Sequence, residues 1–242
     1  MPLVSSLLKE YSRTLRLGNI EKLIDQVEYH NREQYVTDLM KLVIEERNKN
    51  RIDRLIRKAG FPSIKTLDNY EFSPITFPQG LNKETLLTLD FIDNRENVLM
   101  LGAVGTGKTH LSIALGVMAC IAGKEVRFYR TGDLTTELLE LHEKNQVSRF
   151  VKKLAQADLL ILDEVGYVPT SKRASELLFT VISNCYERQS IIVTSNLELG
   201  RWNEVFGDDR LTAALIDRMI HHAHILVFKG ESYRYKQALM KK

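Results

Sequence analysis

Residues 98–109 read Val98-Leu-Met-Leu-Gly102-Ala-Val-Gly-Thr-Gly107-Lys108-Thr109. The four apolar residues predict a buried strand, and the apolar pattern that starts at Leu111 predicts a helix, so the glycines lie between a strand and a helix. The loop matches G-x-x-x-x-G-K-[ST], in which glycines let successive backbone N–H groups face one anion. The N-terminus of the following helix adds positive charge. The stretch therefore predicts a nucleoside triphosphate site.

We expect the whole loop and the first helical turn to bind the nucleotide. In this pattern Lys108 reaches the β- and γ-phosphates, and the hydroxyl of Thr109 ligates Mg²⁺. A dinucleotide site is excluded because His110 stands where the third glycine of that fingerprint belongs. The predicted nucleotide-binding residues of the loop are Gly102, Ala103, Val104, Gly105, Thr106, Gly107, Lys108, Thr109 and His110.

A second apolar run, Leu159-Leu-Ile-Leu, ends in Asp163-Glu164. Parallel sheets bind ligands at the carboxyl ends of their strands, so this acidic pair is expected beside the phosphate loop. Asp163 is predicted to bind both nucleotide and Mg²⁺, and Glu164 to orient or deprotonate the attacking water. Glu164 thus favours nucleotide hydrolysis over nucleotide binding alone.

A third run, Ile191-Ile-Val-Thr194, continues into Ser195-Asn196. Asn196 is expected to contact the γ-phosphate or the attacking water. An asparagine after a strand is also common in turns, so the prediction depends on the order phosphate loop, Asp-Glu, Asn along the chain.

Short apolar runs alternate with helical patterns from Asn97 onward. Five strands are predicted, and helical patterns occur around 108–122, 134–155 and 173–188. This alternation predicts an α/β fold with a five-stranded parallel sheet covered on both faces. The strands are expected at 98–101, 126–129, 159–162, 191–194 and 225–228.

The first 60 residues are different, because apolar side chains recur at helical spacing and proline is absent after Pro2. Gly60-Phe61-Pro62 ends that pattern. We therefore expect a small all-α N-terminal domain at 1–66, which binds DNA or a partner, and an ATPase core at 67–242 whose C-terminal lid segment is very short.

Composition limits the possibilities further. With 242 residues, 44% of them hydrophobic and 27% charged, the chain is typical of a globular protein rather than a disordered or fibrous one. A net charge of +3 restricts any nucleic-acid surface to a local patch. The two cysteines fall in apolar helical patterns, which indicates a reducing cytoplasm, and no apolar run is long enough for a membrane span.

The sequence resembles the AAA+ ATPases, and within them the DnaC-like group and its IstB-type helpers of insertion-sequence transposition. The resemblance covers nearly the whole chain. The segments that carry it are Lys58-Ala-Gly-Phe-Pro62, Gly107-Lys-Thr-His110-Leu, Leu162-Asp-Glu-Val-Gly166-Tyr, Thr194-Ser-Asn196, Leu215-Ile-Asp-Arg218-Met and Ser232-Tyr-Arg234.

The resemblance implies an AAA+ core that hydrolyses ATP with Mg²⁺. It implies that Arg218 is the arginine finger that reaches a neighbouring subunit, so that a homo-oligomer forms through the ATP sites, and that Arg234 is a second sensor arginine. It also implies a helper that delivers duplex DNA, with little sequence preference, to a transposase encoded alongside. A DnaC-type helicase loader is the alternative. A small-molecule P-loop kinase is disfavoured, because Glu164 and Asn196 suit hydrolysis.

Two clusters outside the nucleotide site remain. Arg47, Arg51, Arg54 and Lys58 share one helix face by their spacing and are the predicted DNA-binding residues, with an ordinary solvated face as the alternative. The run His221-His222-Ala-His224 is interpreted as structural or surface histidines, because no acidic or thiol partner is close to it in the sequence.

Overall fold

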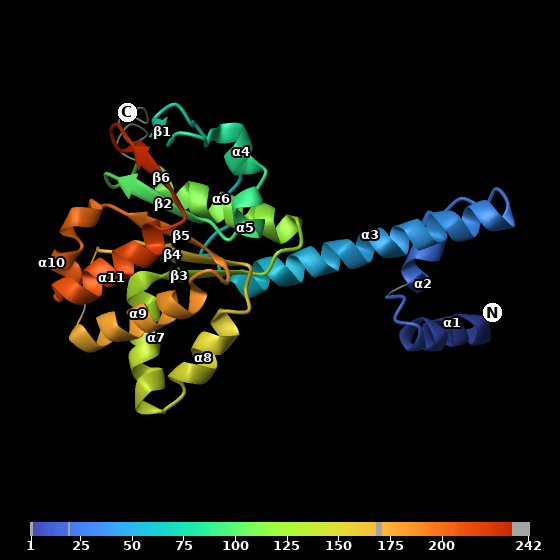
Figure 1. Cartoon of the computed structure of the whole chain (residues 1–242). Coiled ribbons are helices and arrows are strands. Elements are labelled where there is room, and N and C mark those ends of the chain that lie inside the picture. The colour runs from blue at the N-terminus through green and yellow to red at the C-terminus, as the bar shows by residue number, and fades with distance from the viewer. Residues whose placement is uncertain (1, 19, 168–170, 234–242) are drawn as a thin grey trace, which may run out of the picture. The chain divides into compact units, whose positions relative to one another are not determined.

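The computed structural model describes residues 2–18, 20–167 and 171–233 (Figure 1). The chain divides into two compact units, 1–54 and 55–242. The division lies inside the long helix α3 (Arg32–Ala59), before the expected boundary at residue 66. The reason is that the last turn of α3 and Phe61 pack on the core of the second unit.

The N-terminal unit is helical, as the apolar spacing predicts. It contains α1 (Pro2–Thr14), α2 (Ile20–Leu23), the 3₁₀ turn η1 (Ile24–Gln26) and most of α3. Leu39 and Val43 are one turn apart on α3 and both are buried, which is the spacing that places two side chains on the same helix face. They form a small core with two residues of α2, Ile20 and Leu23.

The second unit is built on a six-stranded sheet of order β1-β6-β2-β5-β4-β3. The five predicted strands are all present and all parallel. Their bounds are β2 (Asn97–Gly102), β3 (Val126–Arg130), β4 (Leu159–Asp163), β5 (Ser190–Ser195) and β6 (Ala223–Phe228). The additional strand β1 (Ile75–Thr76) pairs antiparallel with β6 at the edge. Two residues are too few to produce a period-2 pattern, so the sequence gives no sign of β1.

Side chains from both faces of the central strands are buried, which agrees with their continuous apolar sequences. Val98 and Met100 pack on one face with α6 (Lys108–Ile121), whereas Leu99 packs on the other face. The remaining short helices are α4 (Lys83–Leu87), α5 (Asp90–Asp93), η2 (Leu199–Arg201) and α10 (Asn203–Phe206), and the longer ones are α9 (Lys172–Cys185) and α11 (Asp209–Ile220). No helix in the described ranges is both long and apolar enough to cross a bilayer.

The helical pattern around 134–155 does not form one continuous helix. Two helices occupy this stretch, α7 (Thr131–Glu143) and α8 (Val147–Leu154). Asn145 separates them with a φ of 54°. Asparagine adopts this left-handed region more readily than most residues, so it ends the first helix without a glycine.

The strand order places the nucleotide-binding segments together. β2 lies between β6 and β5, and β4 lies on the other side of β5. Since these four strands are parallel, the loops after β2, β4 and β5 leave the sheet at the same edge.

Candidate functional site

The phosphate loop between β2 and α6 requires its glycines. Gly102, Gly105 and Gly107 have φ values of +147°, +80° and +99°. A Cβ atom on Gly102 would lie 2.3 Å from the carbonyl oxygen of Phe228, and one on Gly105 would lie 2.2 Å from Oγ of Ser232. The loop therefore runs too close to the chain after β6 for any side chain at these positions, and it turns where only glycine is unstrained.

Lys108 begins α6 and folds back over the loop. Its Nζ donates hydrogen bonds of 2.7 Å to the carbonyl oxygens of Gly102 and Ala103. Burial lowers the pKa of Lys108 to about 8, although the carboxylates of Asp163 and Glu164 act in the opposite direction. The ammonium group is therefore already within the curve of the loop, where its charge is costly without an anion.

Asp163 connects the loop to the two neighbouring strands. Its Oδ1 accepts a hydrogen bond of 2.8 Å from Oγ1 of Thr109 and one of 2.6 Å from Oγ1 of Thr194. Its main-chain oxygen accepts a further hydrogen bond from Oγ1 of Thr131, at 2.9 Å. With only 1% of its surface exposed, Asp163 is fixed by three hydroxyl groups. Thr131 and Thr194 were not predicted as site residues, although both lie next to the carboxyl end of a strand.

Glu164 differs from Asp163 in both backbone and exposure. Its φ is +59°, in the left-handed region that non-glycine residues avoid, and its N–H donates to Oγ1 of Thr194 at 3.0 Å. The side chain is exposed and lines a cavity of about 510 Å³ together with Gly166 and Tyr167. Left-handed backbone costs on the order of 1–2 kcal/mol per residue. Here it directs the carboxylate out of the sheet into space that admits water.

Asn196 follows β5 and is half-buried. Its Oδ1 is a buried oxygen without a hydrogen-bond partner among the described residues. Buried polar side-chain atoms nearly always have a partner, so such an atom needs an explanation. A bound group in the crevice beside β5 would supply one.

The segment before β1 packs on the phosphate loop, which the sequence did not predict. The hydroxyl of Tyr70 donates to the carbonyl oxygen of Gly107 at 3.2 Å, and its ring lies 5.2 Å from that of His110. Burial raises the pKa of Tyr70 above its usual value. His110 Nε2 lies 2.7 Å from the carbonyl oxygen of Thr66. His110 thus contacts the segment before β1. The sequence contains no motif around Tyr70, so its contact with the phosphate loop could not be predicted.

The two predicted arginines have different surroundings. Arg218, on α11, donates to Oγ of Ser183 and lies over the ring of Phe179, 4.5 Å from its centroid. Both contacts are with α9. Arg234 lies outside the described residues. The chain just before it does contact the phosphate loop, because the N–H of Tyr233 donates to the carbonyl oxygen of Gly105 at 3.0 Å.

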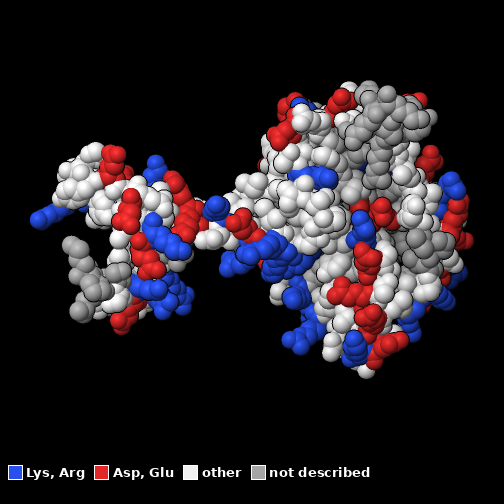
Figure 2. Space-filling view, turned by 180° about the vertical axis from the view of Figure 1, so that it is seen from behind, with Lys and Arg blue, Asp and Glu red and all other residues white. Residues whose placement is uncertain are grey.

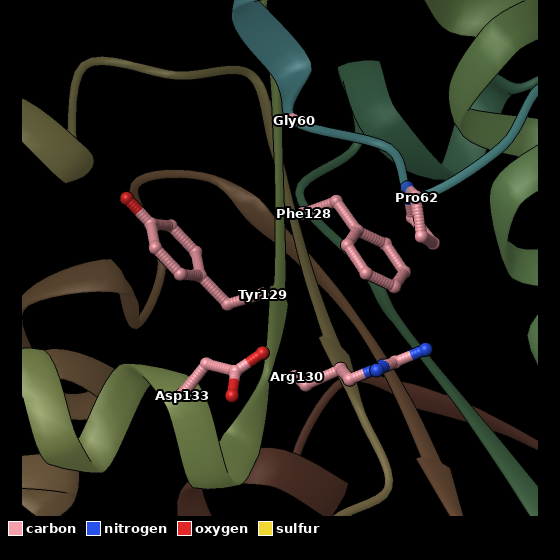
Figure 3. Close-up of a pocket in the computed structure, with 6 residues that line it drawn as sticks. All are labelled: Gly60, Pro62, Phe128, Tyr129, Arg130 and Asp133. Atoms are coloured by element: carbon pink, nitrogen blue, oxygen red, sulfur yellow. The ribbon is translucent and has the colours of Figure 1, made fainter.

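A smaller cavity of about 150 Å³ adjoins the end of β3 (Figure 3). Phe128 and Tyr129 point to opposite sides of the strand, as alternation along a strand requires. Arg130 and Asp133 line both this cavity and the larger one beside Glu164. Gly60 and Pro62 close the smaller cavity on the other side.

The predicted basic face lies on α3, where blue and red side chains are interspersed in Figure 2. Arg47 donates to the carbonyl oxygen of Arg16, and Lys58 forms a 2.7 Å ion pair with Glu125. Arg51 and Arg54 are exposed and have no hydrogen-bond or ion-pair partner among the described residues. Two of the four predicted cations are thus fully available on this face.

The donor set fits a nucleoside triphosphate with Mg²⁺. The loop has the glycine conformations that let backbone N–H groups converge, and a buried ammonium group lies against it. Mg²⁺ prefers oxygen ligands, which the hydroxyl of Thr109 and the carboxylate of Asp163 provide next to each other. Asn196 adds, at the same edge of the sheet, a buried oxygen that has no hydrogen-bond partner within the described ranges.

Comparison with known proteins agrees with this geometry. Residues 14–241 match the family described as IstB-like ATP binding protein. The chain belongs to this family. The putative ATP-binding protein of insertion sequence IS21 from Pseudomonas aeruginosa is 40% identical over 194 residues, which cover 79% of this chain and 72% of that protein. The corresponding protein of IS5376 from Geobacillus stearothermophilus is 35% identical over 204 residues, which cover 84% of this chain and 81% of that protein.

Solved structures show the same fold as this IstB-like chain. The DnaC helicase loader has a TM-score of 0.52 at 24% identity, over 68% of this chain and 96% of that one. AMPPCP-bound DnaA from Aquifex aeolicus has a TM-score of 0.55 at 24% identity, over 75% of this chain and 55% of that one. The core of the IstB-like protein therefore has the DnaC-like AAA+ fold that the resemblance implied.

Proposed function

We propose that this IstB-like protein hydrolyses ATP with Mg²⁺ and acts as the helper ATPase of an insertion sequence. The observation that carries the chemistry is the cluster in which Thr109 and Thr194 both donate to Oδ1 of Asp163, beside the buried ammonium of Lys108. A cluster of this kind supports a metal–triphosphate site more strongly than an anion site, because a carboxylate beside phosphates needs a cation between them.

The residues divide the work between binding and hydrolysis. Backbone N–H groups of residues 102–109 and the ammonium of Lys108 hold the phosphates, while Thr109 and Asp163 hold Mg²⁺. A Mg²⁺ ion held by these two residues would supply positive charge next to the phosphate oxygens. Glu164 accepts the proton of the attacking water, for which its exposed carboxylate is placed. Asn196 positions that water through its Oδ1, which accepts no hydrogen bond from any described residue, or the γ-phosphate through its side-chain N–H.

Hydrolysis in our proposal needs a second subunit. Arg218 contacts α9 through Ser183 and Phe179 and has no described contact with its own phosphate loop. An arginine finger supplied by a neighbour would act at an interface between copies of the chain, so ATP binding would favour a homo-oligomer. Arg234, which lies outside the described residues, acts as a second sensor arginine on the nucleotide.

The oligomer acts on DNA in the cytoplasm and delivers it to a transposase. Two relatives bear the name of an insertion-sequence ATP-binding protein, which supports a role in transposition. We place the DNA contacts on α3, where Arg51 and Arg54 are exposed and unpaired among the described residues. Contacts of this kind neutralise phosphates and carry no sequence information, so we expect duplex binding with little sequence preference.

A DnaC-type helicase loader is the second candidate, since the core also has the fold of the DnaC helicase loader. The two functions differ in their protein partner. A loader binds a helicase ring, whereas the helper binds a transposase on DNA.

Purified protein, a DNA duplex and the transposase encoded next to this reading frame would test the proposal. The helper function predicts a ternary complex that forms with a non-hydrolysable ATP analogue and not without nucleotide. The Lys108→Ala variant is the control, because it should not form the complex with the ATP analogue or without nucleotide. A complex with the replicative helicase instead, and none with the transposase, would favour the loader.

A further inference from the structure

Three potential metal ligands come together at the edge of the sheet where its parallel strands begin. Glu187 lies in the turn between α9 and β5, and His221 and His222 follow the last residue of α11. One ligand atom from each of the three residues lies within 4.8 Å of the other two. All three side chains are exposed, so they can adjust to a ligand. The missing acidic partner, which made a metal site improbable from sequence, is thus supplied by a residue 34 positions away.

The main chain around the three residues is held by Asn97, which is 8% exposed. Its Nδ2 donates to the carbonyl oxygen of Met219 at 3.1 Å, and its N–H donates to that of His222 at 2.6 Å. Its Oδ1 accepts from the N–H of Ile191 at 2.9 Å. One buried side chain therefore fixes the end of α11 to the start of β5, the two segments that flank the cluster.

Side-chain contacts orient the ligands as well. The hydroxyl of Tyr186 lies 2.9 Å from Nδ1 of His221. In metal sites, a ligating imidazole commonly has its other ring nitrogen in such a hydrogen bond. Arg95 donates to the main-chain oxygen of Glu187 at 3.1 Å, and the rings of His221 and His222 pack with centroids 4.1 Å apart.

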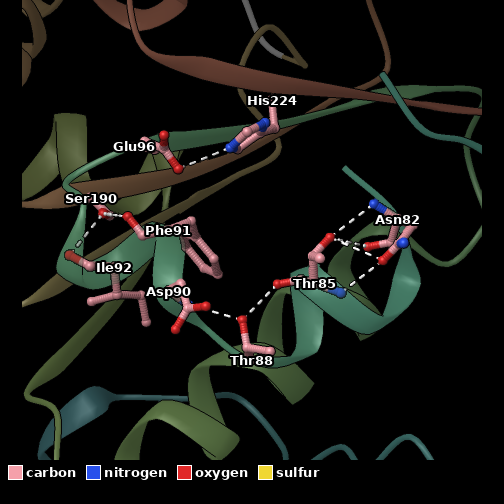
Figure 4. A network of polar contacts seen from close by, with 9 residues as sticks. All are labelled: Asn82, Thr85, Thr88, Asp90, Phe91, Ile92, Glu96, Ser190 and His224. Atoms are coloured by element: carbon pink, nitrogen blue, oxygen red, sulfur yellow. Dashed lines mark hydrogen bonds and ion pairs between the residues drawn. The ribbon is translucent and has the colours of Figure 1, made fainter. Parts of the chain in front are cut away.

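The third histidine of the run does not belong to this cluster. Nε2 of His224 lies 3.0 Å from a carboxylate oxygen of Glu96, as Figure 4 shows. The pair forms on β6 and the residue before β2. His224 is therefore a control for metal binding by the cluster, because it has a carboxylate partner, Glu96, but belongs to no group of three ligands in the described part of the chain.

We propose that Glu187, His221 and His222 bind one divalent transition-metal ion, of which Zn²⁺ is the best fit. Two imidazoles and one carboxylate are a common zinc donor set, and they leave the fourth position to water or to a group of another molecule. Mg²⁺ and Ca²⁺ favour all-oxygen sites, so they would not compete well. Donor atoms around a tetrahedral zinc ion lie about 3.3 Å apart, which these exposed side chains reach by rotation. The ion would join the α9–β5 turn to the α11–β6 turn.

Titration of the untagged, full-length protein with Zn²⁺ alone, followed by competition with a chromogenic zinc indicator, tests the proposal. We expect one Zn²⁺ per chain. His222→Gln and Glu187→Gln should each weaken binding by at least about tenfold, whereas His224→Gln and His142→Gln, which alters an exposed histidine of α7, should leave it unchanged. Tyr186→Phe should weaken binding by about tenfold without abolishing it, because it removes the hydroxyl next to Nδ1 of His221 and leaves all three ligands in place.

Two results would overturn the site. One is wild-type Zn²⁺ affinity in both Glu187→Gln and His222→Gln, with circular dichroism showing that the variants are folded. The other is displacement of Zn²⁺ by millimolar Mg²⁺, which would place the bound ion at Thr109 and Asp163 instead. Titration with Co²⁺ gives an independent readout, since visible absorption bands of a tetrahedral site should appear in the wild type and His224→Gln and be absent from His222→Gln.

Discussion

The hydroxyl of Thr109 donates a 2.8 Å hydrogen bond to Oδ1 of Asp163, although 54 residues separate the two in the chain. The contact forms because β2 and β4 run parallel on either side of β5, so the loops after them meet. A hydroxyl that already points at a carboxylate oxygen is arranged for one metal ion to bind both. The same oxygen also accepts from Thr194, which restricts the rotation of the carboxylate.

Thr109→Val should raise the Mg²⁺ concentration needed for half-maximal ATP turnover by about tenfold or more. Valine has the shape of threonine without the hydroxyl, so the change removes a metal ligand and leaves the packing. Turnover measured across a Mg²⁺ series checks this. Thr106→Val is the control for the Mg²⁺ requirement, since the hydroxyl of Thr106 bonds the carbonyl oxygen of Ala103 rather than Asp163. Equal Mg²⁺ requirements in the two variants would remove Thr109 from the metal site.

The affinity for ATP should fall as the pH rises through about 8. Burial lowers the pKa of Lys108 to about 8 in the free protein, and a bound triphosphate would raise it again. Binding therefore takes up a proton above this pH and weakens by up to about tenfold for each further pH unit. Below it, the group is charged in both states and the affinity is constant. Equilibrium binding of a fluorescent ATP analogue between pH 7 and pH 9.5 measures the effect.

Lys108→Ala gives the reference for that experiment. It should lose ATP binding at every pH, because the backbone alone leaves the triphosphate without sufficient positive charge. A wild-type affinity that does not change between pH 7 and pH 9.5 would contradict the contact between Lys108 and the phosphates.

Arg218→Ala should still bind ATP but hydrolyse it about 10³-fold or more slowly. In our proposal, Arg218 of one subunit acts on the nucleotide site of the next. Mixing the Arg218→Ala and Lys108→Ala variants should therefore restore part of the activity. In such mixed oligomers, an intact nucleotide site of one chain meets an intact arginine of the other. No recovery in oligomers shown to contain both chains would mean that Arg218 acts within its own subunit or not at all.

Arg51→Ala with Arg54→Ala should weaken DNA binding on all sequences and flatten its salt dependence. Each lost phosphate contact lowers the slope of log affinity against log salt by about 0.9, so we expect a change of about 2 per protomer. Adding Arg47→Ala should increase the change to nearly 3, less if its contact with Arg16 keeps it from DNA. ATP turnover without DNA should stay nearly the same.

The matched control for this prediction is Lys41→Ala with Lys49→Ala. Both lysines are exposed on α3. At about 100° per residue, Lys49 falls on the opposite side of the helix from Arg51 and Arg54, and Lys41 falls about 80° from Arg51, outside the basic face. The control removes the same charge from the same helix and should leave the slope unchanged. Equal slopes in the two variants would instead place the DNA contacts on the core, most plausibly around residues 131–144.

The sequence predicted those parts of the molecule that depend on local pattern. Continuous apolar runs predicted five parallel strands, and the glycine spacing around Lys108 predicted the loop whose positive φ values are now seen. The acidic pair after β4 was expected near the loop, because parallel strands end at one edge. The contact between Thr109 and Asp163 agrees with that placement.

Other features depend on contacts between distant residues, and no local pattern encodes them. Tyr70 lies over the loop because the whole segment before β1 packs there, and its hydroxyl reaches Gly107 37 residues later. The break at Asn145 depends on one left-handed residue in an otherwise helical pattern. Glu187 joins the histidines after α11 only because β2 and its Asn97 hold the two turns together.

ATP turnover by Glu164→Gln tests the central claim most directly. The substitution keeps the size of the side chain and removes the base, so ATP affinity should stay at the wild-type value. Turnover should fall by about 10²- to 10⁴-fold, the range that a positioned general base contributes. Wild-type turnover in a folded Glu164→Gln variant would contradict hydrolysis at this site by the mechanism proposed here.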